Sequence, residues 1–394
     1  MIPIANRPGP ARAPAFALWA LGFRPFYLLA SAFAAISVPL WVAQFAGWLP
    51  GAYLQGPLWH GHEMLFGFTV AVIAGFLFTA VRNWTERPTP TGTALAACAA
   101  LWVAGRVLVL TPFATAAAVA NAAFPVAVAV GIGIPLWRSG NRRNFFFVGL
   151  LLALGFATLA FHLSLQGVVA WPVRAGIEAG LDLVLFVMAV MGGRVIPMFT
   201  NNGVPGAKAR RHPWAERLSL GGALALVAAD LLPAPAAIVA AIAFAAALAH
   251  AVRLFLWDPW ATRAKPLVWI LHAAYAWIVA YLLLRGLAAI GLVAPALAIH
   301  ALTVGAIGGL TIGMMTRTAR GHTGRPLVPD RYEVACYVLV QLAALVRVAG
   351  ALVLPSAYVG TVAVSGVLWS AAFATYAARY WPILTRARID GRPG

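Results

Sequence analysis

The chain has 394 residues, of which 62% are hydrophobic and only 10% are charged, and its formal net charge is +18. A soluble domain of this composition would have too few polar side chains to cover its surface, so the sequence excludes a water-soluble enzyme or binding module. It predicts an all-α, polytopic membrane protein that forms a single transmembrane domain over 1–394.

Twelve apolar segments follow one another without a long polar segment between them. Runs of roughly 18–25 apolar residues match the length that crosses ~30 Å of hydrocarbon, so we expect twelve transmembrane helices. The N-terminus precedes a long apolar run without a small-residue cleavage site, which indicates a retained first helix rather than a signal peptide. The predicted helices cover 25–47, 59–81, 93–111, 114–136, 145–167, 175–197, 217–233, 236–256, 266–289, 296–317, 332–354 and 358–381.

Lysine and arginine alternate between the loops. The N-terminal tail, every second loop and the C-terminal tail are basic, whereas the loops between them carry almost no positive charge. Basic loops of membrane proteins stay in the cytoplasm, so both termini are predicted to be cytoplasmic. Topology thus accounts for the charge, and we expect no nucleic-acid partner. The basic positions include Arg7, Arg12, Arg24, Arg82, Arg87, Arg138, Arg142, Arg143, Lys208, Arg210, Arg211, Arg217, Arg263, Lys265, Arg320, Arg325, Arg331, Arg386, Arg388 and Arg392.

Four histidines fall in the predicted outer leaflet: His60, His62, His162 and His300. A single interfacial histidine is usually wetted or hydrogen-bonded, but four at one depth favour ligation of a metal or of haem iron, because imidazole is the usual protein ligand for both. Residues two apart on a helix differ by ~200°, so His60 and His62 cannot both face one site from a regular helix. His60 and Glu63 do share a face.

The remaining histidines and the cysteines give weaker signals. Interior cysteines of a membrane span are usually small core residues, and histidines in loops are usually solvated. We therefore expect structural or loop roles for all of these residues except His272, whose role is left open. They are Cys98 and Cys336 inside spans, His250 and His272 in the predicted inner leaflet, and His212 and His322 in predicted cytoplasmic loops.

The sequence contains a hidden repeat. His62 and His300 superpose with a constant shift of 238 residues, which favours an ancient duplication because several neighbours then coincide. The interval of eight helices suggests a four-helix unit used three times, near 1–112, 113–234 and 235–394. On the second helix, glycines at 305, 309 and 313 form a small-residue stripe that predicts helix packing. The coincident pairs are Gly67 and Gly305, Arg82 and Arg320, Thr85 and Thr323, and Arg87-Pro88 and Arg325-Pro326.

Twelve helices with histidines near the outer face resemble the architecture of the catalytic subunit of haem–copper oxidases and nitric oxide reductases, although the paired copper histidines of those enzymes have no counterpart as a pair here. At the level of motifs the chain resembles the NnrS family more closely. The motifs are WHGHEMLFGFTVAVIAGFLFTAVRNWT (59–85), GGRVIPMFTNN (192–202), PLVWILHAAYAW (266–277) and HALTVGAIGGLTIGMMTRTARGHTGRP (300–326).

The NnrS resemblance implies a haem- and copper-containing protein of the bacterial inner membrane that binds or reduces nitric oxide and relieves nitrosative stress. An unidentified electron donor would be a partner beside the lipid bilayer. Whether the protein is an enzyme is left open; if it is, we expect an oxidoreductase of the nitric oxide reductase type. Two other functions stay open: a haem and copper handling protein that repairs nitrosylated centres, and an ion-coupled transporter.

The repeat and the resemblance together suggest a division of the histidines. His62 and His300 are expected to face each other across one haem, because they are repeat-equivalent and lie at matching depths. Copper is expected between His60 and His162, with Glu63 as a further ligand, because imidazole nitrogens suit copper.

Four other ionisable residues complete the predicted site. Arg106 and Arg285 are expected to neutralise haem propionates, the alternative being that they snorkel to the interface. Glu178 and Asp182, one helical turn apart, are expected to pass protons inward if nitric oxide is reduced. An ion pair of Glu178 with Arg174 is the structural alternative.

Overall fold

The described part of the chain consists of helices and loops. The computed structural model describes residues 16–392, and no strand occurs among them; Arg7 and Arg12, used above to predict the topology, lie outside this range. Every one of the twelve predicted segments is helical. The elements of the first half are α1 (Phe23–Phe45), α2 (Gly56–His62), η1 (Glu63–Thr69), α3 (Val70–Thr85), α4 (Gly92–Leu108), α5 (Ala114–Arg138), η2 (Arg142–Asn144), α6 (Phe146–Leu165) and α7 (Ala175–Gly203).

The second half continues in the same way, with two predicted spans, 296–317 and 332–354, each divided into several elements. These elements are α8 (Pro213–Leu231), α9 (Ala236–Leu256), η3 (Pro259–Thr262), α10 (Pro266–Ala289), α11 (Pro295–His300), η4 (Ala301–Gly308), α12 (Gly309–His322), α13 (Arg331–Leu345), η5 (Val346–Gly350), α14 (Ala351–Val353), η6 (Pro355–Ala357) and α15 (Tyr358–Thr385).

Ten helices of the described chain are long and apolar enough to cross a membrane, which supports a multi-pass membrane protein. The prediction of twelve spans is confirmed for these ten only. The helix α4 has 17 residues and is short for a span, and α8 carries the charged residues Glu216, Arg217 and Asp230.

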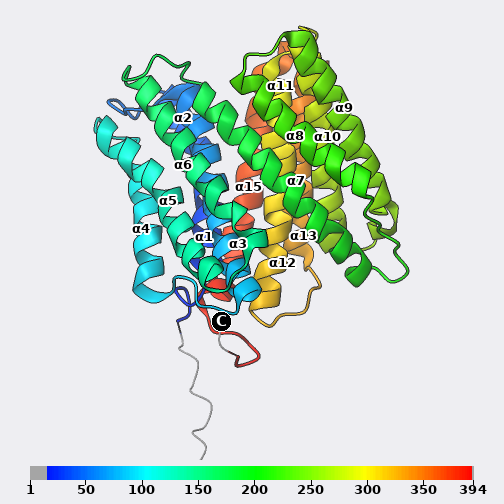
Figure 1. Ribbon diagram of the computed structural model, residues 1–394. Coiled ribbons are helices and arrows are strands. Elements are labelled where there is room, and N and C mark those ends of the chain that lie inside the picture. Colours follow the sequence, from blue (N-terminus) through cyan, green and yellow to red (C-terminus); the bar gives the residue numbers. More distant parts are fainter. Residues whose placement is uncertain (1–15, 393–394) are drawn as a thin grey trace, which may run out of the picture.

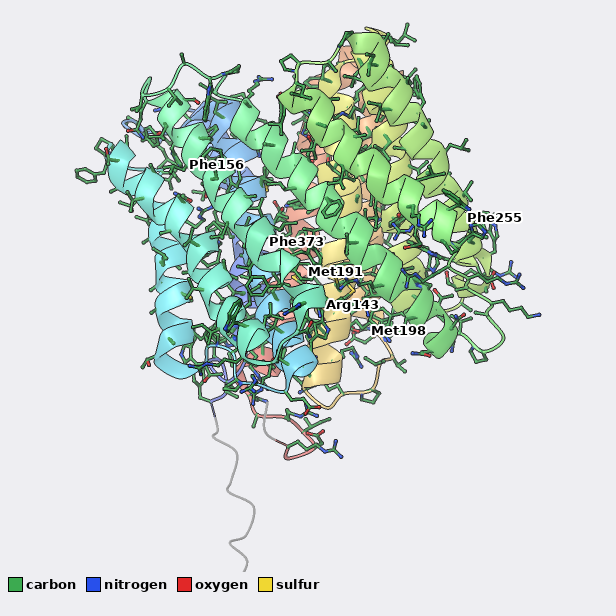
Figure 2. All side chains as sticks on the ribbon, viewed as in Figure 1. Arg143, Phe156, Met191, Met198, Phe255 and Phe373 are labelled. Carbon is green, nitrogen blue, oxygen red and sulfur yellow. The ribbon has the colours of Figure 1, made fainter. Side chains whose placement is uncertain are left out.

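Large apolar side chains such as Phe156 and Phe255, 63% and 70% exposed, project from the outside of the bundle, where lipid would cover them (Figure 2).

The bundle has two distinct ends. Figure 1 shows α2 and α11 at one end, whereas the C-terminus and the exit of α12 lie at the other. The first and last helices, α1 and α15, lie side by side; the indole Nε1 of Trp369 donates to the carbonyl of Ala34 at 3.2 Å and joins them. The long helix α7 contacts α6, α8, α10 and η1. It therefore connects the two halves of the chain beside the histidine end.

Both helices of the internal repeat change from α to π geometry directly after their histidine. The π segment η1 begins one residue after His62, and η4 begins one residue after His300. The hydroxyls of Thr85 and Thr323, at the exits of these helices, each donate to the carbonyl four residues earlier, at 2.7 and 2.6 Å. The backbone thus supports the predicted repeat for these two helices. The middle unit of the predicted three stays a prediction.

The glycine stripe of η4 and α12 packs against α10, as predicted. A methyl group on Gly305 would overlap the indole of Trp277, while Gly309 and Gly313 meet residues of α10 that lie one and two turns earlier. Gly67, the repeat-equivalent of Gly305, leaves the same room for a side chain of α4. Small residues allow this close approach of helices in a bilayer, where apolar burial gives little driving force.

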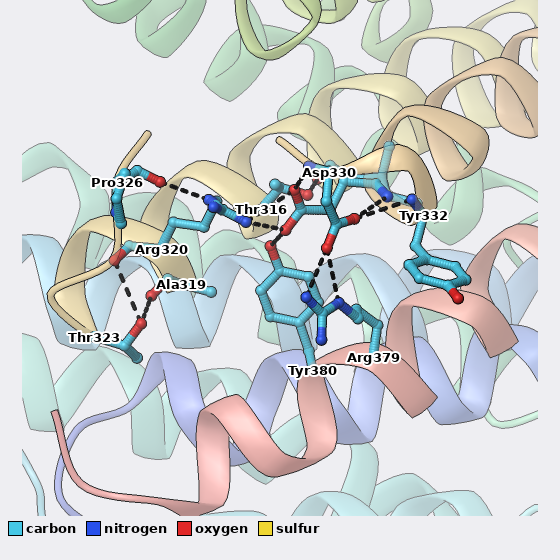
Figure 3. Close-up of polar contacts among 11 residues, drawn as sticks. Thr316, Ala319, Arg320, Thr323, Pro326, Asp330, Tyr332, Arg379 and Tyr380 are labelled. Atoms are coloured by element: carbon cyan, nitrogen blue, oxygen red, sulfur yellow. Dashed lines mark hydrogen bonds and ion pairs between the residues drawn. The ribbon is translucent and has the colours of Figure 1, made fainter. Parts of the chain in front are cut away.

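A polar cluster fixes the start of α13 at the end opposite to the histidines (Figure 3). Asp330 caps the helix: its carboxylate accepts from the backbone N–H of Glu333 at 3.2 Å, and the Glu333 carboxylate accepts from the N–H of Asp330 at 2.7 Å. Arg320 of α12 donates to Glu333 at 2.8 Å, and the hydroxyl of Tyr380 also donates to it. Arg379 of α15 binds Asp330 at 2.6 Å. Three helices are therefore joined by charge-assisted hydrogen bonds.

This cluster predicts a pH dependence of stability. Burial acts to raise the pKa of Asp330, but hydrogen bonds from Arg379 and from backbone N–H groups outweigh it, so the pKa lies below its usual value. A lowered pKa gives stabilisation that is complete above the unfolded pKa of about 3.9 and is lost as the pH falls through the folded pKa. We expect the unfolding temperature of the detergent-solubilised protein to drop more steeply below about pH 4 than that of Asp330→Asn, which keeps the cap and cannot titrate. Parallel curves would contradict this.

Candidate functional site

The four histidines predicted for the outer leaflet lie in two pairs. His60 and His300 line one cavity, whereas His62 and His162 approach each other through their Nε2 atoms at 3.1 Å. The structure thus pairs the histidines differently from the prediction, which placed His62 opposite His300 and His60 opposite His162. The reason is the ~200° that separates residues two apart on a helix, since α2 is regular helix through both positions and sends them to different sides.

The cavity that contains His60 and His300 has a volume of about 380 Å³. We call it the upper cavity. It lies between the two broken helices, α2–η1 and α11–η4, and is closed by residues of α1, α7, η5 and α15. Its size is within the range of about 300–1,000 Å³ that is common for small-molecule sites. Its walls are mostly apolar and aromatic, and the basic and acidic side chains that line it are His60, Arg174, Glu178, His300 and Arg347.

The two cavity histidines are held to different degrees. The Nδ1 atom of His300 lies 2.6 Å from the carbonyl oxygen of Ala296. A carbonyl only accepts, so Nδ1 carries the proton and Nε2 keeps its lone pair. The imidazole of His60 lies against the indole of Trp41, with ring centroids 5.0 Å apart, and its buried Nδ1 has no hydrogen-bond partner within the described residues. His300 is therefore held by a backbone hydrogen bond at Nδ1, and His60 is constrained mainly by packing.

Arg347 is a functional candidate that the sequence reasoning missed. It is 8% exposed, and its guanidinium donates to the hydroxyl of Tyr358 at 3.1 Å, while its Nη1 atom has no hydrogen-bond partner in the part of the chain described. Its position in the outer half of the predicted span 332–354 was the signal, because an ionisable residue inside a span is a candidate by default. Arg347 gives the upper cavity a buried positive charge.

His62 and His162 form the second pair, which is completely buried. The Nδ1 atom of His62 donates to the carboxylate of Glu63 at 2.7 Å, so its Nε2 atom, facing His162, keeps a lone pair. The hydroxyl of Tyr53 lies 3.2 Å from Nδ1 of His162. Both rings are thus held from the far side by a second group, as is usual for histidines that bind a metal.

Glu63 joins this pair to a buried arginine. Arg106 of α4 lies 3.0 Å from the carboxylate of Glu63 and also donates to the side chain of Asn121 on α5. A buried carboxylate needs such a counter-charge, because taking it out of water is costly. The expected roles of both residues change: Arg106 neutralises Glu63 rather than a propionate, and Glu63 orients His62.

No three side chains of His, Cys, Asp or Glu converge as a metal site anywhere in residues 16–392. The expected set of His60, His162 and Glu63 is therefore not assembled. What the structure offers instead are pairs of imidazoles, each contributed by two different helices. A pair of neutral imidazoles with oriented rings still suits copper or the axial positions of a haem iron.

Arg285 and Asp182 bind each other instead of facing the cavity. Arg285 of α10 donates to Asp182 of α7 at 2.8 Å and also binds Asp230 of α8. The expected role of Arg285 as a propionate partner is replaced by this three-helix ion-pair cluster. Glu178 does line the upper cavity together with Arg174, so the two acidic residues of the predicted proton path have different surroundings.

Two of the remaining histidines, His250 and His272, contact neighbouring helices. His250 lies 2.7 Å from the hydroxyl of Tyr275 and 3.2 Å from the carbonyl of Ser219, so both of its nitrogens are occupied. His272 of α10 lies 2.8 Å from the hydroxyl of Thr200 on α7. The contacts of His250 agree with the core role predicted for it. The hydrogen-bond contact of His272, whose role was left open, joins α10 to α7.

The buried ion pair generates a prediction about stability. Replacing Arg106 by Met leaves the carboxylate of Glu63 buried without its counter-charge, and we expect a loss of about 3–5 kcal/mol. The double variant Glu63→Gln with Arg106→Met should recover part of this loss, because no uncompensated charge is left. The measurement is thermal unfolding of the purified protein, with Arg138→Met on the exposed end of α5 as the matched control. An unchanged unfolding temperature for Arg106→Met would show that the pair does not form.

Comparison with known proteins gives a family match that covers nearly the whole chain. A search of curated proteins found no match. The family model described as NnrS protein matches residues 17–388, nearly the whole chain, including all four histidines of the two pairs. The chain therefore belongs to the NnrS family.

Proposed function

We propose that this chain is a haem- and copper-containing inner-membrane protein that binds nitric oxide. Membership of the NnrS family supports a membrane protein of the nitric oxide response. The observation that carries the proposal is the arrangement of four histidines at one end of the bundle, with one pair on a cavity and the other in direct contact. Such a division suits two different metal groups.

The upper cavity fits a haem by the chemistry of its lining. His60 and His300 lie on the two broken helices, and His300 presents an unprotonated Nε2 atom because Ala296 occupies its Nδ1. Arg347 and Arg174 supply positive charge suited to haem propionates, since arginine pairs well with carboxylates. The unpartnered Nη1 atom of Arg347 is a buried donor that such a carboxylate would satisfy.

The buried pair fits copper. The Nε2 atoms of His62 and His162 face each other, and Glu63 and Tyr53 hold the two rings from behind. Imidazole is a preferred ligand of copper, and outer partners that fix the ring and its tautomer raise its donor strength. The pair lies behind the cavity wall, because His60 and His62 point to different sides of α2.

A haem held by His60 and His300 would supply the iron centre at which nitric oxide is captured. His60 would be the more easily displaced of these two residues, because its Nδ1 atom has no partner among the described residues and only packing holds its ring. Glu178 lines the same cavity and can deliver a proton there, which reduction of nitric oxide consumes. The apolar walls exclude water.

The topology completes the proposal. The basic loops predict that both termini lie in the cytoplasm, and the histidine end lies opposite to the C-terminus (Figure 1). The two metal pairs would then lie near the outer face of the inner membrane. A reductase would need an electron donor on that side, whereas a binding protein would not.

The proposal predicts which cofactor, haem or copper, is lost when each of the four histidines is replaced. We expect His300→Ala to abolish haem binding, whereas His60→Ala should retain haem with one protein ligand fewer, which would shift the Soret band. His62→Ala and His162→Ala should lose copper and keep haem. The measurements are the absorption spectrum, haem extraction and metal analysis of protein expressed with added haem and copper.

Two controls make this prediction specific. His212→Ala, in an exposed loop, should change neither cofactor. Tyr53→Phe keeps both copper ligands and removes only an outer partner, so copper affinity should fall by about 10-fold to 100-fold without loss of haem. Full haem retention in His300→Ala, or absence of haem from the unaltered protein, would contradict the proposed function.

Turnover distinguishes a reductase from a binding or handling protein. The unaltered protein, supplied anaerobically with nitric oxide and a chemical reductant, produces nitrous oxide only if it is a reductase. In that case Glu178→Gln should slow turnover and leave nitric oxide binding unchanged, because it removes a proton donor and no ligand. Transfer of haem or copper to a metal-free acceptor protein without nitrous oxide would instead support the handling function.

A further inference from the structure

A second cavity lies next to the upper one, farther toward the C-terminal end of the bundle. Its volume is about 110 Å³, and residues of α3, α7 and α12 form most of its wall. We call it the lower cavity. Met191, one of its lining residues, lies between the two ends of the bundle (Figure 2). The lower cavity is therefore well inside the region that a membrane would surround.

The lower cavity is chemically unsuited to water. Its lining is aliphatic, aromatic and methionine side chains except for Tyr27, Thr69 and Thr311. The hydroxyl of Thr69 donates to the carbonyl of Met64 at 2.8 Å, and that of Thr311 donates to the carbonyl of Gly308 at 3.0 Å. Both hydroxyl protons are thus used within their own helices. The third hydroxyl, that of Tyr27, has no hydrogen-bond partner among the described residues. One free hydroxyl falls short of the two to four polar partners that a buried water needs, and empty apolar cavities of similar size bind apolar atoms such as xenon.

The two cavities adjoin at two residues that are related by the internal repeat. Thr69 and Ile307 line both cavities, and their numbers differ by 238, the shift that superposes His62 on His300. Val72 and Leu310, which line the lower cavity, are related by the same shift. The two cavities therefore lie along the boundary between the two repeat-related helices, where the side chains of the helices leave space between them.

One face of α7 forms the third wall of both cavities. Its lining residues recur every three or four positions, from Ile177 and Leu181 in the upper cavity to Val184, Val187 and Met191 in the lower one. This spacing is that of a single helix face. The same apolar stripe thus runs without interruption from the lower cavity to the cavity that contains the histidines.

We propose that the lower cavity is a holding site for a small apolar gas and that it supplies this gas to the upper cavity past Thr69 and Ile307. Its volume would hold on the order of three molecules of the size of water, each of which takes ≈ 30 Å³ in the liquid. Such gases dissolve better in the bilayer than in water, so a site at this depth collects them where they are concentrated. That the gas is nitric oxide rests on the function proposed above.

The test uses xenon, which reports an apolar cavity without any need for haem. Crystals of the full-length protein, pressurised with xenon, should show an anomalous peak in the lower cavity. Val187→Phe places a ring into this space and should remove the peak. Because overpacking can impair folding, Leu310→Ala serves as a second variant from the opposite wall, and it should keep or strengthen the peak. Val130→Phe, on the exposed outside of α5 at 57% exposure, is the matched control.

A second measurement connects the cavity to the histidines. In haem-loaded protein, Val187→Phe should slow nitric oxide association by on the order of tenfold, equivalent to about 1.4 kcal/mol of added barrier, while Val130→Phe leaves the rate unchanged. A lower cavity without xenon, or filled by a lipid chain, would overturn the proposal even if haem binds. Xenon in the cavity of a protein that takes up no haem would support the holding site and refute the proposed function. Xenon binding with an unchanged association rate would refute the supply role.

Discussion

The π-helical turns after His62 and His300 are the constraint on which the rest of the structure depends. A π turn bonds each N–H to the carbonyl five residues earlier and so leaves gaps in helix packing; the hydroxyl of Thr69 spans the same five residues to the carbonyl of Met64. The break lets η1 and η4 depart from regular helix where they face each other. Both cavities lie along this line, and His60 and His300 line the upper one.

The dry interior of a bilayer explains where the ionisable groups lie. Without water, a buried charge needs a partner, and several arginines inside the helices have one: Arg106 binds Glu63, and Arg285 binds Asp182. Buried polar atoms without partners occur in several parts of the described chain, and at the upper cavity they include Nδ1 of His60 and Nη1 of Arg347. Polar groups without partners are costly, so at a cavity that is also lined by two histidines these atoms suit a polar or metal-bearing ligand.

Several features were predictable because they depend on local sequence. Apolar runs of sufficient length predicted all twelve helical segments, and the spacing of the glycines at 305, 309 and 313 predicted helix packing, for which the structure supplies α10 as the partner. The constant shift between His62 and His300 predicted two related helices. The depth of the four histidines was also predictable, since their distance from the ends of apolar runs fixes it. Even the divergence of His60 and His62 followed from helix geometry.

The partners across helices were not predictable, because they depend on how the helices rotate and pack. The sequence by itself determined that the chain is a helical membrane protein, that four of its eight histidines gather at one end, and that two of its helices are related. Only the tertiary structure decided that His60 shares a cavity with His300 and that His62 meets His162. The reason is that sequence periodicity defines the faces of one helix, whereas a site between helices requires the rotation and contacts of several, and close packing sets these for the whole bundle at once.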